Sequence, residues 1–398
     1  MPEISQRGQL MPPSPIRKLT PFANGAAEKG INVLHLNIGQ PDIETPPQII
    51  DAVKHTQLQV LAYSPSAGFQ SYRTALAGYY SRKGITVLPG EITVTTGGSE
   101  AIFLAMMSCM NPGDEIIIPE PFYANYNGFA VEAGVTVVPI HSSIEENFAL
   151  PKIEAFEKAI TSKTKAIMIC NPNNPTGYLY SREELEVLRD ICLKHDLFLF
   201  SDEAYREFCY DGRKHISVMA LEGLEQHAIL LDTISKRYSA CGARIGALVT
   251  HNTTVGATVL NFAQARLSPP TFEQILGEAA CALPEDYFDA VLAEYQLRRD
   301  TLVKRLQAMP GVVCPEPKGA FYVMARLPVK SSEDFCHWLL SSFAHEGSTV
   351  MMAPASGFYA TKGLGVDEVR MAYVLNVADI HLAMDCLEAA LKVYPDTK

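Results

Sequence analysis

The sequence predicts an α/β protein, with a large domain around a mostly parallel β-sheet and a smaller α+β domain after it. Between about residues 95 and 250, short apolar runs alternate with longer helical patterns, which is typical of helices covering a parallel sheet. After about residue 285, long charged helical patterns and short strands replace that alternation. The length of 398 residues exceeds what one small core needs, so two domains are expected.

The chain begins with residues that we expect to form an arm, followed by a short helix before about residue 30. The segment NVLHLNIGQPDIETPP (32–47) predicts a strand that breaks into a proline-rich turn. A helix is expected at SREELEVLRDICLKH (181–195), where Ser181 and Glu184 form a capping box. The strands of the sheet are expected at EIIIP (115–119), VTVVPI (135–140), KAIMIC (165–170), LFLFSD (197–202), AILLD (228–232) and IGALVT (245–250).

The C-terminal part predicts a separate α+β domain. Helices are expected at 286–309, 333–347 and 380–394, with a strand at VRMAYVL (369–375) between the last two. We therefore divide the chain into an arm that contributes to the small domain (1–45), a large domain (46–285) and a small domain (286–398).

Composition narrows the class of protein. Apolar residues make up 47% and charged residues 19%, as in ordinary globular proteins. The net charge of -11 argues against a nucleic-acid surface but allows a locally positive pocket. Nine scattered cysteines without a CxxC pair indicate buried thiols in a reducing compartment, and no metal site is expected. Without a signal peptide or a long apolar window, a cytoplasmic protein that does not contact membranes is expected.

In open α/β sheets, ligands bind beyond the carboxyl ends of the strands, so the residues just after each predicted strand are the first candidates for a site. After EITVTT (91–96), two glycines lead into a helix whose first amides, at Gly98, Ser99 and Glu100, would form an anion site. The alternative is a purely structural glycine turn.

Polar residues come after three further strands. NPNNPTG (171–177) forms a turn that presents Asn174, although a simple tight connection is the alternative. Asp202 comes directly after a buried strand and needs a partner, which could be a structural ion pair; Tyr205 lies three residues further on. After AILLD come Thr233 and Lys236, and then Arg244 in a stretch of small residues.

Together these residues place an anion cradle, a carboxylate, a phenol, an amide and a lysine on one rim. Pyridoxal phosphate has a phosphate, a ring nitrogen and an aldehyde, and would use all of them. The ordered set NPNNPTG, SDEAY and SK, with an arginine eight residues after the lysine, resembles the fold-type I aminotransferases of classes I and II, the aspartate aminotransferase superfamily. The resemblance extends from NIGQPD to RMAYV.

The resemblance implies roles for individual residues. Lys236 would bind the cofactor covalently, Asp202 would pair with its ring nitrogen, and Tyr123 would stack on the ring. Tyr205 and Asn174 would hydrogen-bond the phenolic oxygen of the ring. The phosphate would be held by Gly98, Ser99, Thr233 and Arg244, at a helix start where the Glu100 carboxylate must turn away.

The resemblance also implies a substrate site and a dimer. Arg370 would bind the substrate α-carboxylate beside the Gly39 backbone, since a guanidinium suits a carboxylate bidentately. Tyr63 would reach the phosphate of the neighbouring subunit, which requires a homodimer.

The expected activity is amino transfer from an L-amino acid to a 2-oxo acid, with Lys236 moving the proton at the substrate Cα. Carbon–sulfur lyase chemistry is the alternative enzyme activity, and a cofactor-binding regulator is a further one. A dicarboxylic substrate needs a second cation, which Arg266 in QARLSPP would supply from the partner subunit; a surface or interface charge is the alternative role. Aspartate with 2-oxoglutarate is the preferred pair, and an aromatic or alanine-type donor is the second choice.

Overall fold

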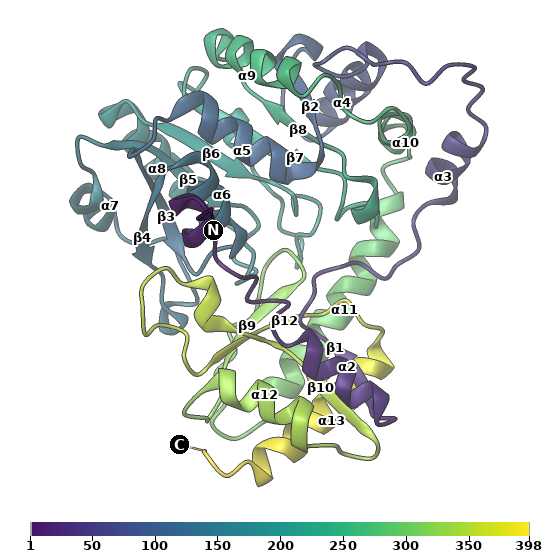
Figure 1. Ribbon diagram of the computed structural model, residues 1–398, viewed down its shortest axis with the longest axis vertical. Coiled ribbons are helices and arrows are strands. Elements are labelled where there is room, and N and C mark those ends of the chain that lie inside the picture. Colours follow the sequence, from purple (N-terminus) through teal and green to yellow (C-terminus); the bar gives the residue numbers. More distant parts are fainter. Residues whose placement is uncertain (1, 398) are drawn as a thin grey trace.

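The computed structural model describes residues 2–397 and contains a central seven-stranded sheet (Figure 1). The strand order is β2-β8-β7-β6-β5-β3-β4. β8 is antiparallel to both its neighbours, and the other four pairings are parallel. The strands are β2 (Ile92–Thr95), β3 (Glu115–Glu120), β4 (Thr136–His141), β5 (Thr164–Cys170), β6 (Phe198–Asp202), β7 (Ala228–Thr233) and β8 (Gly246–Val249). All six predicted apolar runs therefore contain a strand, and the α/β fold class is confirmed.

Helices cover the sheet, and its central strands are buried on both faces. In β6, Leu199 and Phe200 are both fully buried, and they belong to different core clusters on opposite sides. The predicted capping box opens α8, where Ser181 and Glu184 exchange hydrogen bonds of 3.2 and 2.7 Å. The helices around the sheet are α3 (Pro47–Lys54), α4 (Gln70–Arg82), α5 (Gly97–Cys109), α6 (Asn125–Ala133), α7 (Ile153–Ala159), α8 (Arg182–His195), α9 (Thr253–Ala265) and α10 (Thr271–Cys281).

The lower part of the molecule in Figure 1 contains two small sheets, helix α2 (Thr20–Glu28) near the start of the chain and three helices from the C-terminal part of the chain. β1 (Asn32–His35) pairs in parallel with β10 (Ser348–Met351), which joins the start of the chain to its C-terminal third. The second sheet has the order β11-β12-β9 and is antiparallel. Its strands are β9 (Tyr322–Arg326), β11 (Ala353–Pro354) and β12 (Glu368–Ala372), and the helices are α11 (Tyr287–Gln307), α12 (Ser332–Ser342) and α13 (Val377–Val393).

One predicted helix ends earlier than expected. α12 stops at Ser342 instead of continuing to residue 347, because Phe343 adopts an extended conformation (φ -123°, ψ 139°) and packs against the core. The domain limits at residues 45 and 285 stay a prediction. Among residues 2–397, no helix is long and apolar enough to cross a membrane.

The N-terminal segment bridges the two parts of the molecule. α1 (Gln6–Leu10) contacts α6 on the large sheet, whereas α2 (Thr20–Glu28) contacts α12. Figure 1 shows the purple chain between these helices crossing from the upper part to the lower part. We call residues 11–19 the strap, and its middle residues line a cavity between the two parts.

Candidate active site

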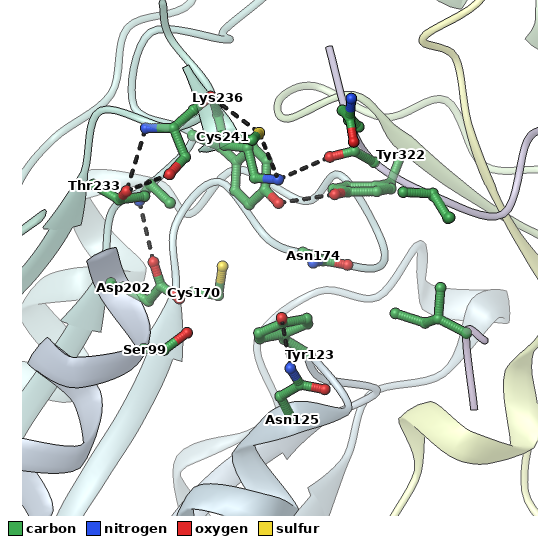
Figure 2. A pocket seen from close by; sticks show the side chains of 18 of the residues that line it. Ser99, Tyr123, Asn125, Cys170, Asn174, Asp202, Thr233, Lys236, Cys241 and Tyr322 are labelled. Carbon is green, nitrogen blue, oxygen red and sulfur yellow. Dashed lines mark hydrogen bonds between the residues drawn. The ribbon is translucent and has the colours of Figure 1, made fainter. Parts of the chain in front are cut away.

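A cavity of about 640 Å³ lies beyond the carboxyl ends of β5, β6 and β7, between the large sheet and the lower part of the molecule (Figure 2). Its lining comes from segments far apart in the sequence, from Ser14 in the strap to Arg370 in β12. Most of the predicted site residues meet there: Gly39, Gly98, Ser99, Tyr123, Asn174, Asp202, Tyr205, Thr233, Lys236, Arg244 and Arg370.

Lys236 lies shortly after the end of β7 and points its amine into the cavity (Figure 2). Nζ donates a hydrogen bond of 2.8 Å to the Gly39 carbonyl and lies 3.7 Å from Sγ of Cys241. A Cβ at Gly39 would lie only 1.7 Å from Oη of Tyr322, so a glycine is required there for close packing. Among the described residues, no carboxylate is paired with this amine.

Asp202 ends β6 at the inner wall of the cavity. Oη of Tyr126 donates to its Oδ2 at 2.8 Å, and the Ala204 amide donates to Oδ1 at 3.1 Å. Removal from water raises the pKa of Asp202, and these two hydrogen bonds oppose that rise. A cationic group in the cavity would stabilise this carboxylate.

Arg370 is 1% exposed, although the structure gives its guanidinium no acidic partner among the described residues. Nη1 donates to Oδ1 of Asn174 at 3.1 Å, and Nη2 donates to the Asn37 carbonyl at 2.5 Å. Nε has no hydrogen-bond partner, and burial lowers the pKa of Arg370. Because a buried cation without a counter-ion is costly, this position is suited to bind an anion from solution.

The other end of the cavity forms an anion cradle. Gly98 and Ser99 lie in the first turn of α5, whose N-terminus lacks a side-chain cap and therefore offers free amides. Arg244 approaches this helix start, and a Cβ at Gly97 would lie 2.5 Å from its Nη2. Gly97 also has a φ of 74°, which favours glycine. The cradle thus combines helix amides with a guanidinium.

Three predicted residues lie outside the cavity lining. The Glu100 carboxylate is turned to the Thr96 amide at 2.6 Å, as the expected reorientation requires. Nη2 of Arg266 donates to the carbonyls of Ser66 and Val94, and its Nε lies 3.4 Å from Oε1 of Glu100. Tyr63 is 79% exposed and therefore points to solvent in the single chain.

Several residues of the site escaped the sequence analysis. Tyr126 is fully buried outside the cavity lining and donates to Asp202; it lies three residues after Tyr123, and that spacing could have indicated a second aromatic residue at the site. Tyr322 hydrogen-bonds to Tyr205 through the two hydroxyls, 2.8 Å apart, but no motif marked it. Ser14, Ile16 and Arg17 of the strap also carried no signal, because the arm has no periodic pattern.

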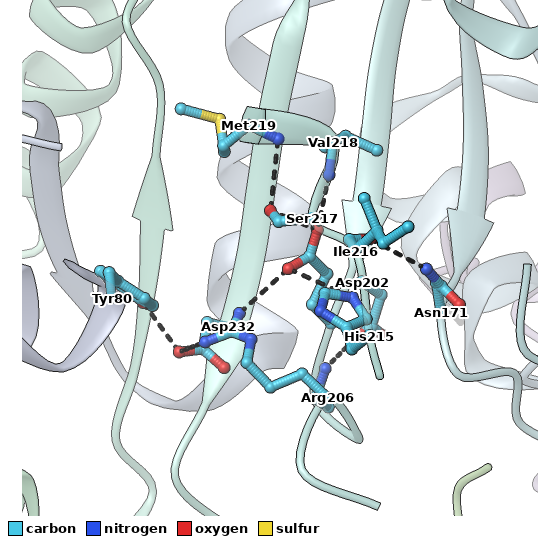
Figure 3. A network of polar contacts seen from close by, with 12 residues as sticks. Tyr80, Asn171, Asp202, Arg206, His215, Ile216, Ser217, Val218, Met219 and Asp232 are labelled. Atoms are coloured by element: carbon cyan, nitrogen blue, oxygen red, sulfur yellow. Dashed lines mark hydrogen bonds and ion pairs between the residues drawn. The ribbon is translucent and has the colours of Figure 1, made fainter. Parts of the chain in front are cut away.

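A buried polar network lies beside the site (Figure 3). Arg237 donates to both carboxylate oxygens of Asp232 at 2.8 and 3.1 Å, Arg206 donates to Oδ2 at 3.1 Å, and Tyr80 donates to the same oxygen at 2.7 Å. Oε1 of Glu203 accepts from Oγ of Ser217 and the Val218 amide, at 2.8 and 3.1 Å. These charges are paired within the protein.

The fold is that of a two-part α/β protein, and its cavity places a lysine between an anion cradle and a buried arginine. The model of the aminotransferase class I and II family matches residues 31–385, so the chain belongs to this family, and its enzymatic class is confirmed.

Similar proteins carry several substrate names. The aspartate aminotransferase of Bacillus subtilis (strain 168) is 30% identical over 98% of this chain and 97% of its own. The aromatic-amino-acid aminotransferase 2 of Thermococcus litoralis is 32% identical, covering 98% of both. Among solved structures, the alanine aminotransferase from Pyrococcus furiosus has a TM-score of 0.90 at 31% identity, covering 98% of this chain and all (100%) of that chain. The aspartate aminotransferase from Thermus thermophilus with maleate has a TM-score of 0.87 at 30% identity and the same coverage, 98% and 100%.

Proposed function

We propose that this aminotransferase uses pyridoxal phosphate to move the amino group of a dicarboxylic L-amino acid, preferably aspartate, to a 2-oxo acid such as 2-oxoglutarate. The observation that carries the proposal is the placement of Arg370, a buried guanidinium without an acidic partner, on the same cavity as Lys236 and Asp202. An amine nucleophile and an α-carboxylate site in one cavity suit an amino-acid substrate.

The residues present fit the cofactor. The cradle of Gly98, Ser99, Thr233 and Arg244 suits its phosphate, and the carboxylate of Asp202 suits a protonated ring nitrogen. Tyr123 would cover the ring, while Asn174 and Tyr205 would bind its phenolic oxygen. When bound, pyridoxal phosphate supplies an electron sink for the charge that develops at the substrate Cα.

The chain itself positions the substrate and moves its proton. Arg370 and the Gly39 backbone bind and orient the α-carboxylate, which fixes Cα relative to the Lys236 amine. Lys236 would hold the cofactor covalently, and its free amine would remove the proton at Cα as a general base. The carboxylate of Asp202 would pair with the ring nitrogen and favour its protonated form.

The choice of donor is tested by measuring kcat/KM for aspartate, glutamate, phenylalanine and alanine with 2-oxoglutarate as acceptor. Support for aspartate comes from the names of the similar enzymes, which also include aromatic and alanine aminotransferases. We expect the dicarboxylic donors to be preferred. A preference for phenylalanine or alanine would favour the alternative donors. Pyruvate release from a cysteine conjugate without an acceptor would indicate lyase activity.

We also propose a cytoplasmic homodimer with shared sites. Tyr63 is 79% exposed, and its neighbours Val60 and Leu61 are 75% and 61% exposed, which suits a subunit interface. Mixing Lys236→Ala and Tyr63→Ala subunits should restore activity above the sum of the two variants, because one hybrid site contains both native residues. No gain after subunit exchange would contradict the sharing of Tyr63.

A further inference from the structure

The cavity has more positive charge than the proposed cofactor and α-carboxylate roles explain. Its ionisable lining comprises the cations Arg17, Lys236, Arg244 and Arg370 and a single carboxylate, that of Asp202. In the proposed function, Lys236 binds the cofactor, Arg244 its phosphate and Arg370 the α-carboxylate. Arg17 has no assigned role, and its side chain has no hydrogen bond or ion pair with the described residues.

The residues before and after Arg17 in the strap are anchored to the protein, which keeps Arg17 at the cavity. The Ile16 carbonyl, just before it, accepts a hydrogen bond of 3.2 Å from Nδ2 of Asn37, and Leu19, two residues after it, is buried in the core. The carbonyl of the same Asn37 binds Arg370 at 2.5 Å. One residue therefore connects the strap to the arginine proposed for the α-carboxylate, so both cations belong to the same part of the site.

We propose that Arg17 binds the side-chain carboxylate of a dicarboxylic substrate and thereby determines specificity; this inference rests on the proposed function. A guanidinium offers two parallel donors to a carboxylate, and a second such contact would distinguish aspartate and glutamate from alanine. With Lys236 and Arg244 assigned to the cofactor, Arg17 and Arg370 are the two cations of the lining left for the two carboxylates of such a substrate.

Arg266, the residue expected from the sequence for this task, is less available. Its Nη2 already binds two backbone carbonyls at 3.2 and 3.1 Å, and its Nε lies beside Glu100. Only Nη1 of Arg266 lacks both a hydrogen bond and an ion pair, whereas the guanidinium of Arg17, an exposed residue of the cavity lining, makes neither kind of contact with the described residues. Substituting Arg17 and substituting Arg266 should therefore have different effects on the binding of a dicarboxylate in one experiment.

The test measures binding of succinate and butyrate to the holoenzyme by calorimetry, because these four-carbon acids differ in one carboxylate and need no turnover. Arg17→Gln should weaken succinate binding on the order of 10- to 100-fold and leave butyrate within about 2-fold. Arg17→Lys should retain part of the preference. Lys18→Gln is the matched control, since it removes the next charge of the strap, an exposed one paired with Glu333.

The outcomes separate the two proposals. Unchanged succinate binding in Arg17→Gln, equal weakening of both acids, or a selective loss in Arg266→Gln instead would each overturn the role of Arg17. If the wild type converts none of the amino donors to a 2-oxo acid, the proposed function fails, whereas the ratio of succinate to butyrate affinity still reports on Arg17. In an active enzyme, the aspartate-to-alanine ratio of kcat/KM should fall in parallel.

Discussion

Two groups of polar and charged residues lie side by side at the strand ends, and they differ in whether their charged members are paired. One lines the cavity and the other forms the buried network. The members of the two groups are neighbours in sequence, in β6 and β7 or in the turns that follow these strands. The cavity and network members of each pair are Asp202 and Glu203, Tyr205 and Arg206, Thr233 and Asp232, and Lys236 and Arg237.

The difference is visible in the two aspartates, Asp202 in the cavity and Asp232 in the network. Burial alone would raise the pKa of Asp232, but Arg206 and Arg237 hold it at about 2. The pKa of Asp202 is raised by its removal from water, because no arginine is paired with it. A buried charge that is paired within the protein stabilises the fold, whereas a buried charge without such a partner can be paired by a bound ligand. Both groups contain acidic and basic residues, so the residue types alone do not tell which group a residue belongs to.

The largest expected effect is on the cavity side. Lys236→Ala should lower turnover roughly 10⁴-fold or more, because it removes both the covalent link and the general base. Its melting temperature without cofactor should change by less than about 3 °C, since the amine makes one hydrogen bond to a carbonyl. Borohydride should fix the cofactor to Lys236 in the wild type, and labelling of another lysine would contradict the assignment.

The matching change on the network side should affect folding instead. Asp232→Asn leaves Arg206 and Arg237 buried without a full counter-charge and should cost about 3–5 kcal/mol of unfolding free energy. Denaturant titration measures this loss. A variant as stable as the wild type would show that the network does not depend on this carboxylate.

Asp202→Asn should separate activity from stability. Turnover should fall roughly 10²-fold, because a neutral amide cannot hold a ring nitrogen in its protonated form. Stability without cofactor should stay equal or rise, because a partly buried charge without a cationic partner is removed. Near-normal turnover would remove Asp202 from the mechanism.

The contribution of Asp232 to stability should also decrease at acidic pH. Its pKa of about 2 in the fold lies below the ordinary value of about 3.9, so its contribution to stability is present above pH 4 and lost as the pH falls towards 2. The slope of unfolding free energy between pH 4 and 2 should therefore be shallower in Asp232→Asn. An unchanged slope would assign the acid sensitivity to other carboxylates.

The contribution of Glu203 to stability should depend on pH in the opposite direction to that of Asp232. Burial raises its pKa to about 7, against Arg206 and its hydrogen bonds, so its contribution is present below about pH 4.3 and declines as the pH rises to 7. Comparing Glu203→Gln with the wild type over this range measures the effect. A flat difference between the two proteins would mean that Glu203 has the same pKa in the folded and unfolded states.

The sequence predicts the sheet and much of the site because both depend on apolar runs. Asp202, Thr233 and Lys236 stand just beyond such runs, where the geometry of a parallel sheet alone places them at the cavity. Arg17 and Tyr322 could not be found in this way. They reach the cavity through contacts between segments hundreds of residues apart, which no local pattern encodes.

The pairing of β1 with β10 also sets an order of events during synthesis. Asn32 emerges early from the ribosome, but its partner Ser348 emerges about 300 residues later, roughly 15–60 s at ordinary elongation rates. By then all seven strands of the large sheet, which ends at Val249, have already been made. The N-terminal segment is therefore among the last parts to reach its final place, and the cavity that it lines stays open on the growing chain until β10 and β12 have been released.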